Sequence, residues 1–275
     1  MTAKTLSPEL KHAMKELRLG QLLPTLAERI ALAEKSELPI EDFLLGLFTD
    51  EIERRRSASA SRRADSAGLD PDMVFDRWDK SAKVTFDRRV LQELTSLRFV
   101  EAQRNVVVLG PVGVGKTFVA NALGLVACRS AFNVRMHRVD ALLRLLKQSR
   151  LDNSRDALMT ELCTIDLLII DDFALEPMTR DESRDIYQLF VERTGRAATI
   201  ITSNRDTADW LAVFDDALLG QGAVDRFKNN AYDFVIDGES YRPRLKPSIE
   251  KDGPPPAAPV TKPTPLLRRR KRPRA

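Results

Sequence analysis

The chain has 275 residues, of which 43% are hydrophobic, and a formal net charge of +4. This length is enough for one large globular domain and a smaller one. No apolar run approaches the ~20 residues of a membrane-spanning helix, and no signal-peptide pattern opens the chain. We therefore expect a cytoplasmic protein with no membrane partner.

The positive charge is concentrated near the C-terminus. Residues 243–275 contain ten basic and two acidic residues, a net +8, whereas the remaining 34 basic and 38 acidic residues give −4. The same segment holds nine of the 15 prolines, a composition that cannot bury a core. We expect residues 246–275 to be a disordered Pro/Arg-rich tail whose arginines contact DNA phosphates; a merely solubilising tail is the alternative.

Residues 1–70 predict a small, all-helical N-terminal domain. Ser7 and Pro8 are typical of a helix start, with Ser as the cap and Pro at the first helical position. A later apolar stripe at helical spacing is expected to face the core; it consists of Ile40, Phe43, Leu44, Leu47, Phe48 and Ile52. Arginines at positions 54, 55, 56, 62 and 63 follow it, either as a solvated face or as a second DNA contact. Gly68 to Pro71 should end this helix.

The most informative segment lies within residues 71–245, the larger of the two predicted domains. It reads Gly110, Pro111, Val112, Gly113, Val114, Gly115, Lys116 and Thr117, the full G-x-x-x-x-G-K-[ST] pattern. An apolar strand, 105–109, precedes it and a helix, 118–129, follows it. The backbone N–H groups of such a loop bind phosphate oxygens, Lys116 would reach the β- and γ-phosphates, and Thr117 would ligate Mg²⁺. We therefore expect residues 71–245 to form an ATPase domain in which Gly110–Phe118 binds ATP.

Two more apolar runs end in polar residues. Leu167–Ile170 leads into Asp171 and Asp172, at the strand end where α/β sheets bind ligands. Asp171 would hold Mg²⁺ through water, and Asp172 would orient or deprotonate the attacking water. Residues 198–203 lead into Asn204, which would hold that water or touch the γ-phosphate, unless it is a plain turn residue. With strands at 133–138 and 232–237, these runs predict an α/β fold, a P-loop NTPase with a five-stranded parallel sheet.

Four other positions have weaker signals. Arg226, before the last strand, can act across a subunit interface as an arginine finger, or can be a helix-surface residue. Arg242, after the last strand, is a candidate phosphate sensor. Asp140 is expected to cap a leucine-rich helix. Trp78, with its aromatic neighbours, is a weak candidate for an adenine pocket.

Together these motifs resemble a known family. The phosphate loop, the 167–172 strand, Ile201–Asn204, Trp210, Asp225–Phe227 and Gly238–Arg242 look like the IstB-like transposition helper ATPases, AAA+ proteins related to the DnaC helicase loaders. The resemblance makes Asp171 and Asp172 the Walker B acids, Asn204 the first sensor and Arg226 the arginine finger. It implies ATP and Mg²⁺ as cofactors and a homo-oligomer with ATP sites at subunit interfaces. The implied partners are double-stranded DNA and a cognate transposase.

The chain departs from this family pattern in two respects. AAA+ proteins usually carry Glu where this chain has Asp172, one methylene shorter, so hydrolysis is expected to be slow. No sizeable helical lid follows the last strand. Two alternatives therefore stay open: a DnaC-type replicative helicase loader, and a nucleotide-gated DNA scaffold with little turnover.

Overall fold

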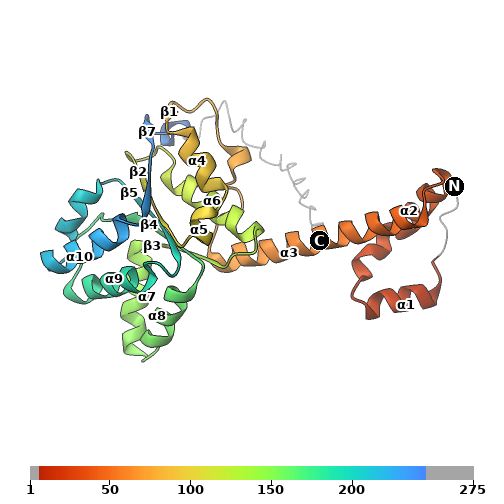
Figure 1. Cartoon of the computed structure of the whole chain (residues 1–275), viewed down its shortest axis with the longest axis horizontal. Coiled ribbons are helices and arrows are strands. Elements are labelled where there is room, and N and C mark those ends of the chain that lie inside the picture. Colours follow the sequence, from red (N-terminus) through yellow and green to blue (C-terminus); the bar gives the residue numbers. More distant parts are fainter. Residues whose placement is uncertain (1–5, 246–275) are drawn as a thin grey trace, which may run out of the picture. The chain divides into compact units, whose positions relative to one another are not determined.

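The structure, a computed structural model, describes residues 6–245 (Figure 1). The chain divides into two compact units between Ser240 and Tyr241. The second unit begins with the short helix η4 (Arg242–Leu245). The predicted disordered tail, 246–275, lies outside the described residues, and the predicted domain limits stay predictions. None of the helices within residues 6–245 is long and apolar enough to cross a membrane.

The N-terminal part is helical, as predicted. It contains α1 (Pro8–Glu16), η1 (Gly20–Leu22), α2 (Leu23–Lys35) and the first half of α3 (Ile40–Ala67). The Ser7 side chain accepts a hydrogen bond from the Leu10 N–H, and Pro8 opens the helix. The side chains that meet in its small core are those of Met14, Leu22, Leu26 and Leu47.

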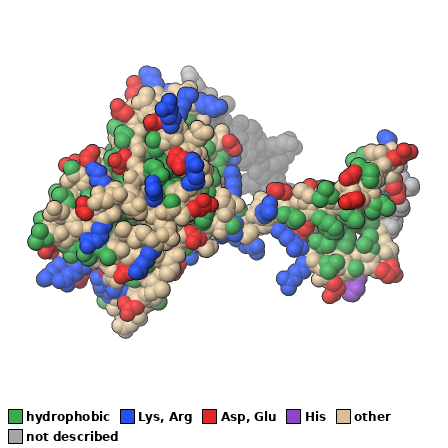
Figure 2. Space-filling view, in the orientation of Figure 1, with side chains coloured by type: hydrophobic (Ala, Val, Ile, Leu, Met, Phe, Trp, Pro, Cys, Tyr) green, Lys and Arg blue, Asp and Glu red, His purple; other side chains and the backbone are tan. Residues whose placement is uncertain are grey.

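The predicted apolar stripe on α3 is only partly core. Leu47 is buried, but Ile40, Leu44, Phe48 and Ile52 are exposed by 78, 41, 46 and 50%. The expectation that the whole stripe faces the core is therefore wrong. The stripe covers a wider arc of the helix than the short preceding helices can cover. Figure 2 shows hydrophobic side chains gathered on the surface of this helical part.

The first unit contains the predicted five-stranded parallel sheet, in the order β3-β4-β5-β2-β6. Its strands are β2 (Asn105–Leu109), β3 (Val134–Arg138), β4 (Leu167–Phe173), β5 (Ala198–Ser203) and β6 (Ala231–Val235). All five lie within two residues of the predicted positions. A short antiparallel pair joins β1 (Val84–Thr85) to β7 (Asp237–Gly238).

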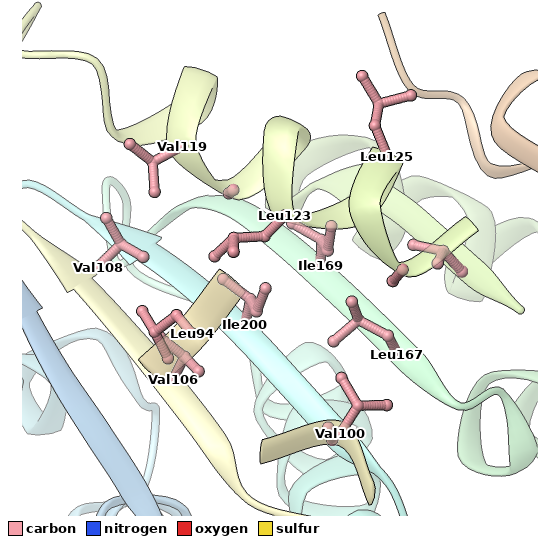
Figure 3. Packing of buried hydrophobic residues seen from close by; sticks show 14 of the residues in the cluster. Leu94, Val100, Val106, Val108, Val119, Leu123, Leu125, Leu167, Ile169 and Ile200 are labelled. Carbon is pink, nitrogen blue, oxygen red and sulfur yellow. The ribbon is translucent and has the colours of Figure 1, made fainter. Parts of the chain in front are cut away.

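Alternate residues of the strands face two different cores. On one face, Val106, Val108 and Ile169 pack with α6 (Lys116–Arg129), α4 (Arg88–Thr95) and α5 (Arg98–Glu101), as Figure 3 shows. On the other, Val107 and Ile170 belong to the core of the remaining helices. These are α7 (Val139–Leu151), α8 (Arg155–Thr164), α9 (Arg180–Arg193), η3 (Thr207–Val213) and α10 (Ala217–Lys228). Because both faces of the sheet are covered, the central strands β2, β4 and β5 read as mainly apolar runs, whereas the edge strands β3 and β6 contain charged residues.

One predicted cap is wrong. Arg138 occupies the N-cap position of α7 without a side-chain capping hydrogen bond, and Asp140 is the second residue of the helix. β3 ends at Arg138 and the helix begins at the next residue, so Asp140 already has helical backbone. Its carboxylate instead lies 3.4 Å from Arg138 Nε and 3.1 Å from Arg144 Nη1.

The end of α3 is fixed to α6. Both Arg63 Nε and Arg63 Nη2 donate to the Cys128 carbonyl, at 2.9 and 2.7 Å. Beyond the helix, the buried Asn121 side chain bonds the N–H and carbonyl of Asp70 and the carbonyl of Met73. Gly68 ends α3 in the left-handed conformation, so the chain turns toward α6 where the sequence predicted a break.

Candidate nucleotide-binding site

The predicted phosphate loop connects β2 to α6. Gly113 and Gly115 have φ of +86° and +101°, in the left-handed region that glycine adopts without strain. Gly115 is the N-cap of α6, and no side chain satisfies the N–H groups at the start of this helix. The N–H groups at a helix N-terminus and the helix dipole both favour an anion there.

The Lys116 ammonium is held within the loop. Its side chain is 5% exposed, and Nζ donates to the carbonyls of Gly110 and Pro111 at 2.9 and 2.7 Å. A phosphate oxygen carries more negative charge than a peptide carbonyl and is the stronger acceptor. The loop thus contains a cation suited to a phosphate group.

Asp171, at the end of β4, lies beside Thr117. Thr117 Oγ1 is 3.0 Å from both carboxylate oxygens of Asp171, which is 3% exposed. Thr202 of β5 donates to the same carboxylate at 2.5 Å. Burial raises the pKa of Asp171, and the hydrogen bond from Thr202 opposes that shift. A buried carboxylate next to a hydroxyl and a phosphate loop is a donor set that Mg²⁺ accepts.

A β-bulge separates Asp171 from Asp172. Ile170 pairs with Ile201, and Phe173 pairs with Ser203, so two aspartates lie opposite one residue, Thr202. Asp172 has φ of +57°, and its N–H donates to Thr202 Oγ1 at 3.0 Å. Bulges next to active sites re-aim side chains. Here the bulge buries Asp171 and leaves the Asp172 side chain 33% exposed.

Asp172 borders a cleft of about 460 Å³ between β4 and α7. Arg138 Nε is 4.0 Å from the Asp172 carboxylate and 3.4 Å from that of Asp140. Glu176 lines the same cleft. Arg138 is not among the site residues predicted from the sequence. Its closeness to Asp172 follows from the pairing of Arg138 with Asp171 in neighbouring strands.

Two further residues touch the loop. A Cβ on Gly113 would lie 2.1 Å from Ser240 Oγ, and a Cβ on Gly115 would lie 2.8 Å from the Trp78 ring. Trp78 also contacts Phe118 edge-on, with ring centroids 5.2 Å apart. The weak sequence signal for an adenine pocket therefore falls on a residue that covers the phosphate loop. Nothing in the sequence indicated the contact with Ser240, which depends on the β1–β7 pairing.

The other predicted site residues are placed differently. Asn204 is half-buried and follows Ser203 at the same sheet edge as Asp171 and Asp172. Arg226 is exposed on α10, where it bonds the Gly222 carbonyl and lies 5.9 Å from the Tyr187 ring centroid. Its contacts within one copy are thus with α10 and α9, away from Thr117. Arg242 belongs to the second unit, so its role as a phosphate sensor stays a prediction.

Among residues 6–245, no three His, Cys, Asp or Glu side chains gather as a metal site.

The parallel sheet, its strand order and the loop geometry define an α/β P-loop fold. Solved structures with a similar fold include DnaI, with 20% identity, a TM-score of 0.52 and coverage of 65% of this chain and 98% of that one. Another is the replication initiator DnaA bound to AMPPCP and single-stranded DNA, with 18% identity and a TM-score of 0.50 over 62% of this chain and 51% of DnaA.

The family is defined by sequence similarity. Residues 12–248 match the IstB-like ATP binding protein family, and the chain belongs to it. An insertion-sequence ATP-binding protein of Mycobacterium tuberculosis is 35% identical over 87% of this chain and 96% of its own length. The ATP-binding protein of insertion sequence IS21 of Pseudomonas aeruginosa is 32% identical over 86% of this chain and 90% of its own length.

Proposed function

We propose that this protein is an ATP-hydrolysing, DNA-binding AAA+ ATPase that assists the transposase of an insertion sequence. The observation that carries the proposal is the contact of Thr117 with Asp171, beside Lys116 at the N-terminus of α6. The names of the relatives, ATP-binding proteins of insertion sequences, support the link to transposition.

The proposed roles follow from the geometry. The N–H groups at the start of α6 and the Lys116 ammonium bind the β- and γ-phosphates. Thr117 and Asp171 would hold Mg²⁺, which would supply positive charge next to the phosphates. Thr202 positions Asp171 by donating to its carboxylate. Asp172, more exposed than Asp171, takes the proton of the attacking water, and Asn204 orients that water.

The remaining roles require other molecules. Arg226 lies outside the cluster around Thr117, which fits action on the ATP site of a neighbouring copy in a homo-oligomer. ATP binding would close that interface, and the closed assembly would hold duplex DNA and engage the transposase. Hydrolysis would then release the DNA or remodel it.

The test is phosphate release by the full chain. ATP turnover is measured with and without Mg²⁺ and duplex DNA, and the Lys116→Ala variant serves as the control for contaminating ATPases. We expect turnover that requires Mg²⁺, rises with DNA and is lost in Lys116→Ala. Failure of the wild-type protein to bind ATP would overturn the proposal. Co-purification with the transposase of the same insertion sequence, in the presence of ATP, tests the partner.

One observation favours a second function, a nucleotide-gated DNA scaffold. The base candidate is Asp172, which is shorter than glutamate and lies 4.0 Å from Arg138 Nε. The shorter side chain reaches less far toward an attacking water than glutamate would, and Arg138 competes with that water for the same carboxylate. ATP-dependent DNA binding without phosphate release would favour this function.

A further inference from the structure

A second cavity lies at the opposite end of the parallel sheet from the phosphate loop. Its volume is about 560 Å³, and we call it the α3 pocket. The residues that line it are Ser59, Arg62, Arg63, Ser66, Asn133, Val134, Arg135, Glu161, Thr164 and Ile165. They come from the end of α3, the start of β3 and the end of α8 (Figure 1). The start of β3 and the end of β2 lie at opposite edges of a parallel sheet, so this pocket is separate from the nucleotide site.

The α3 pocket is lined by an excess of positive charge, although the chain before residue 243 carries a net negative charge. Three guanidinium groups line it, those of Arg62, Arg63 and Arg135, against one carboxylate, Glu161. The chain before residue 243 carries a net −4. A local excess of arginine on an acidic body cannot be explained by overall solubility, and it creates a local attraction for anions.

Two of the three guanidinium groups are already oriented. Arg63 is fixed by the Cys128 carbonyl, and its Nη1 donates to Ser59 Oγ at 2.8 Å. Arg135 Nη1 donates to the Ser66 carbonyl and hydroxyl at 3.1 Å, and its other nitrogens bond Glu161. Because these side chains lose little freedom on binding, a ligand meets a pre-organised cationic wall.

Arg62 completes the wall. It is exposed and makes no hydrogen bond or ion pair within residues 6–245. Between it and Arg56 the helix carries only Ser and Ala, residues 57–61, so an extended anionic chain can approach the α3 backbone closely. Arg55 precedes Arg62 by seven residues, which places it two turns earlier on the same face of α3.

We infer that the α3 pocket binds a phosphodiester group of the duplex DNA backbone, with Arg62 as its direct contact. The inference deepens the proposed function and depends on DNA binding by this protein. Arginine offers planar, paired donors that match phosphate oxygens, and Ser59 and Ser66 add hydroxyls at the rim of the pocket. Contacts of this kind position the protein on DNA without selecting a sequence.

The test is a salt series of DNA affinity with the full chain and ATP. Arg62→Ala is compared with Arg184→Ala, which removes the same charge from an exposed position on α9. Losing one phosphate contact lowers the slope of log affinity against log salt by about 0.9. We expect that change for Arg62→Ala only. If the plots of log affinity against log salt for the wild type and Arg62→Ala meet at 1 M salt, the affinity of Arg62→Ala at 0.1 M salt is about eightfold lower than that of the wild type. Arg62→Lys should restore most of the slope, and ATP binding should not change.

A second arm separates the sources of phosphate. Tripolyphosphate is titrated into Lys116→Ala protein, whose phosphate loop is disabled, with and without Arg62→Ala. Tripolyphosphate binding that needs Arg62, with an unchanged DNA slope, would assign the pocket to free polyphosphates and overturn the inference. Equal slopes for Arg62→Ala and Arg184→Ala would also overturn it. If the wild-type protein does not bind DNA at all, the proposed function itself fails.

Discussion

At the scale of single residues, Asp172 is the side chain on which turnover is proposed to depend. Asp172→Asn keeps the size of the side chain and removes the base. We expect ATP affinity to stay within about twofold and turnover to fall about 100-fold, in the range that general-base catalysis contributes. ATP-dependent DNA complexes should persist longer. Nucleotide titration and phosphate release measure the two effects separately.

The matched control is Glu176→Gln, since Glu176 borders the same cleft. If Glu176→Gln suppresses turnover and Asp172→Asn does not, the base is Glu176. Unchanged turnover in both variants would show that neither Asp172 nor Glu176 is the general base.

Glu51 is a residue-scale feature of the helical part. Its buried carboxylate accepts hydrogen bonds from Arg54 Nε and Arg55 Nε, both at 2.7 Å. The hydrogen bond from Arg54, opposed by burial and aided by Arg55, lowers the pKa of Glu51 from 4.5 to about 2. A lowered pKa in the folded state stabilises the protein above pH 4.5, and this stabilisation is lost as the pH falls toward 2.

Glu51→Gln should therefore destabilise the protein at pH 7, by about 1–2 kcal/mol for weakened charge-assisted hydrogen bonds. The difference in the free energy of unfolding between Glu51→Gln and the wild type should shrink as the pH falls from 4.5 to 2. Denaturant unfolding of the full chain at several pH values measures it. Glu53→Gln is the control, because Glu53 is 71% exposed and 3.9 Å from Arg56. If this difference in free energy stays constant down to pH 2, the link between stability and the ionisation of Glu51 is contradicted.

At the scale of elements, Arg193 joins three parts of the first unit. Its guanidinium is 1% exposed and donates to Thr199 Oγ1 at 2.8 Å and to the carbonyls of Leu162 and Ile165 at 2.6 and 2.9 Å. It also bonds the Ala198 carbonyl. Burial lowers the pKa of Arg193 to about 10, so the group stays charged at neutral pH. The end of α9 is thereby tied to the end of α8 and the start of β5.

Arg193→Met should fill the volume but leave several buried acceptors without donors. We expect a loss of about 3–5 kcal/mol of stability, or about 10 °C in melting temperature for a unit of this size. Thermal unfolding followed by circular dichroism measures it. Arg196→Met, an exposed arginine on the same turn, should change stability by less than about 0.5 kcal/mol. Equal effects of the two substitutions would contradict the structural role of Arg193.

The central strands β2, β4 and β5 could be predicted because they are buried on both faces and read as mainly apolar runs, whereas the edge strands β3 and β6 are more exposed and contain charged residues. The phosphate loop could be predicted because its spacing is local. Contacts that depend on the order of the strands in the sheet could not be predicted from the sequence. Thr202 meets Asp171 only because β5 lies beside β4, and the left-handed Asp172 results from the bulge between these strands. The exposed side of the α3 stripe also escaped prediction, since periodicity marks an apolar face without showing what covers it.

At the scale of the whole molecule, the Pro/Arg-rich tail is expected to add phosphate contacts. Deleting residues 247–275 removes eight basic and two acidic residues, a net loss of +6. The slope of log DNA affinity against log salt should become shallower by about 0.9 per lost contact, while ATP binding and sequence preference stay unchanged. A salt series on both proteins with ATP measures this. Identical slopes would make the tail a solubilising or partner-binding extension.

The arrangement of subunits is tested by mixing two inactive variants. Arg226→Ala keeps the phosphate loop but lacks the finger, and Lys116→Ala keeps the finger but lacks the loop cation. If Arg226 acts on a neighbouring subunit, some interfaces in the mixture are functional. In these interfaces an Arg226→Ala subunit supplies the intact phosphate loop and a Lys116→Ala subunit supplies the intact arginine finger. Random mixing in equal amounts makes roughly a quarter of the interfaces complete in a head-to-tail assembly.

We therefore expect each variant alone to be nearly inactive and the equal mixture to regain up to about a quarter of wild-type turnover. Arg226→Ala alone should bind ATP nearly normally as a monomer, because the contacts of Arg226 within residues 6–245 are with Gly222 of α10 and Tyr187 of α9. Phosphate release across a series of mixing ratios is the measurement, with circular dichroism to verify that both variants fold. Activity that never exceeds the sum of the two variants at any ratio would count against action between subunits. Arg226 would then be a surface residue of α10, with its guanidinium resting beside Tyr187.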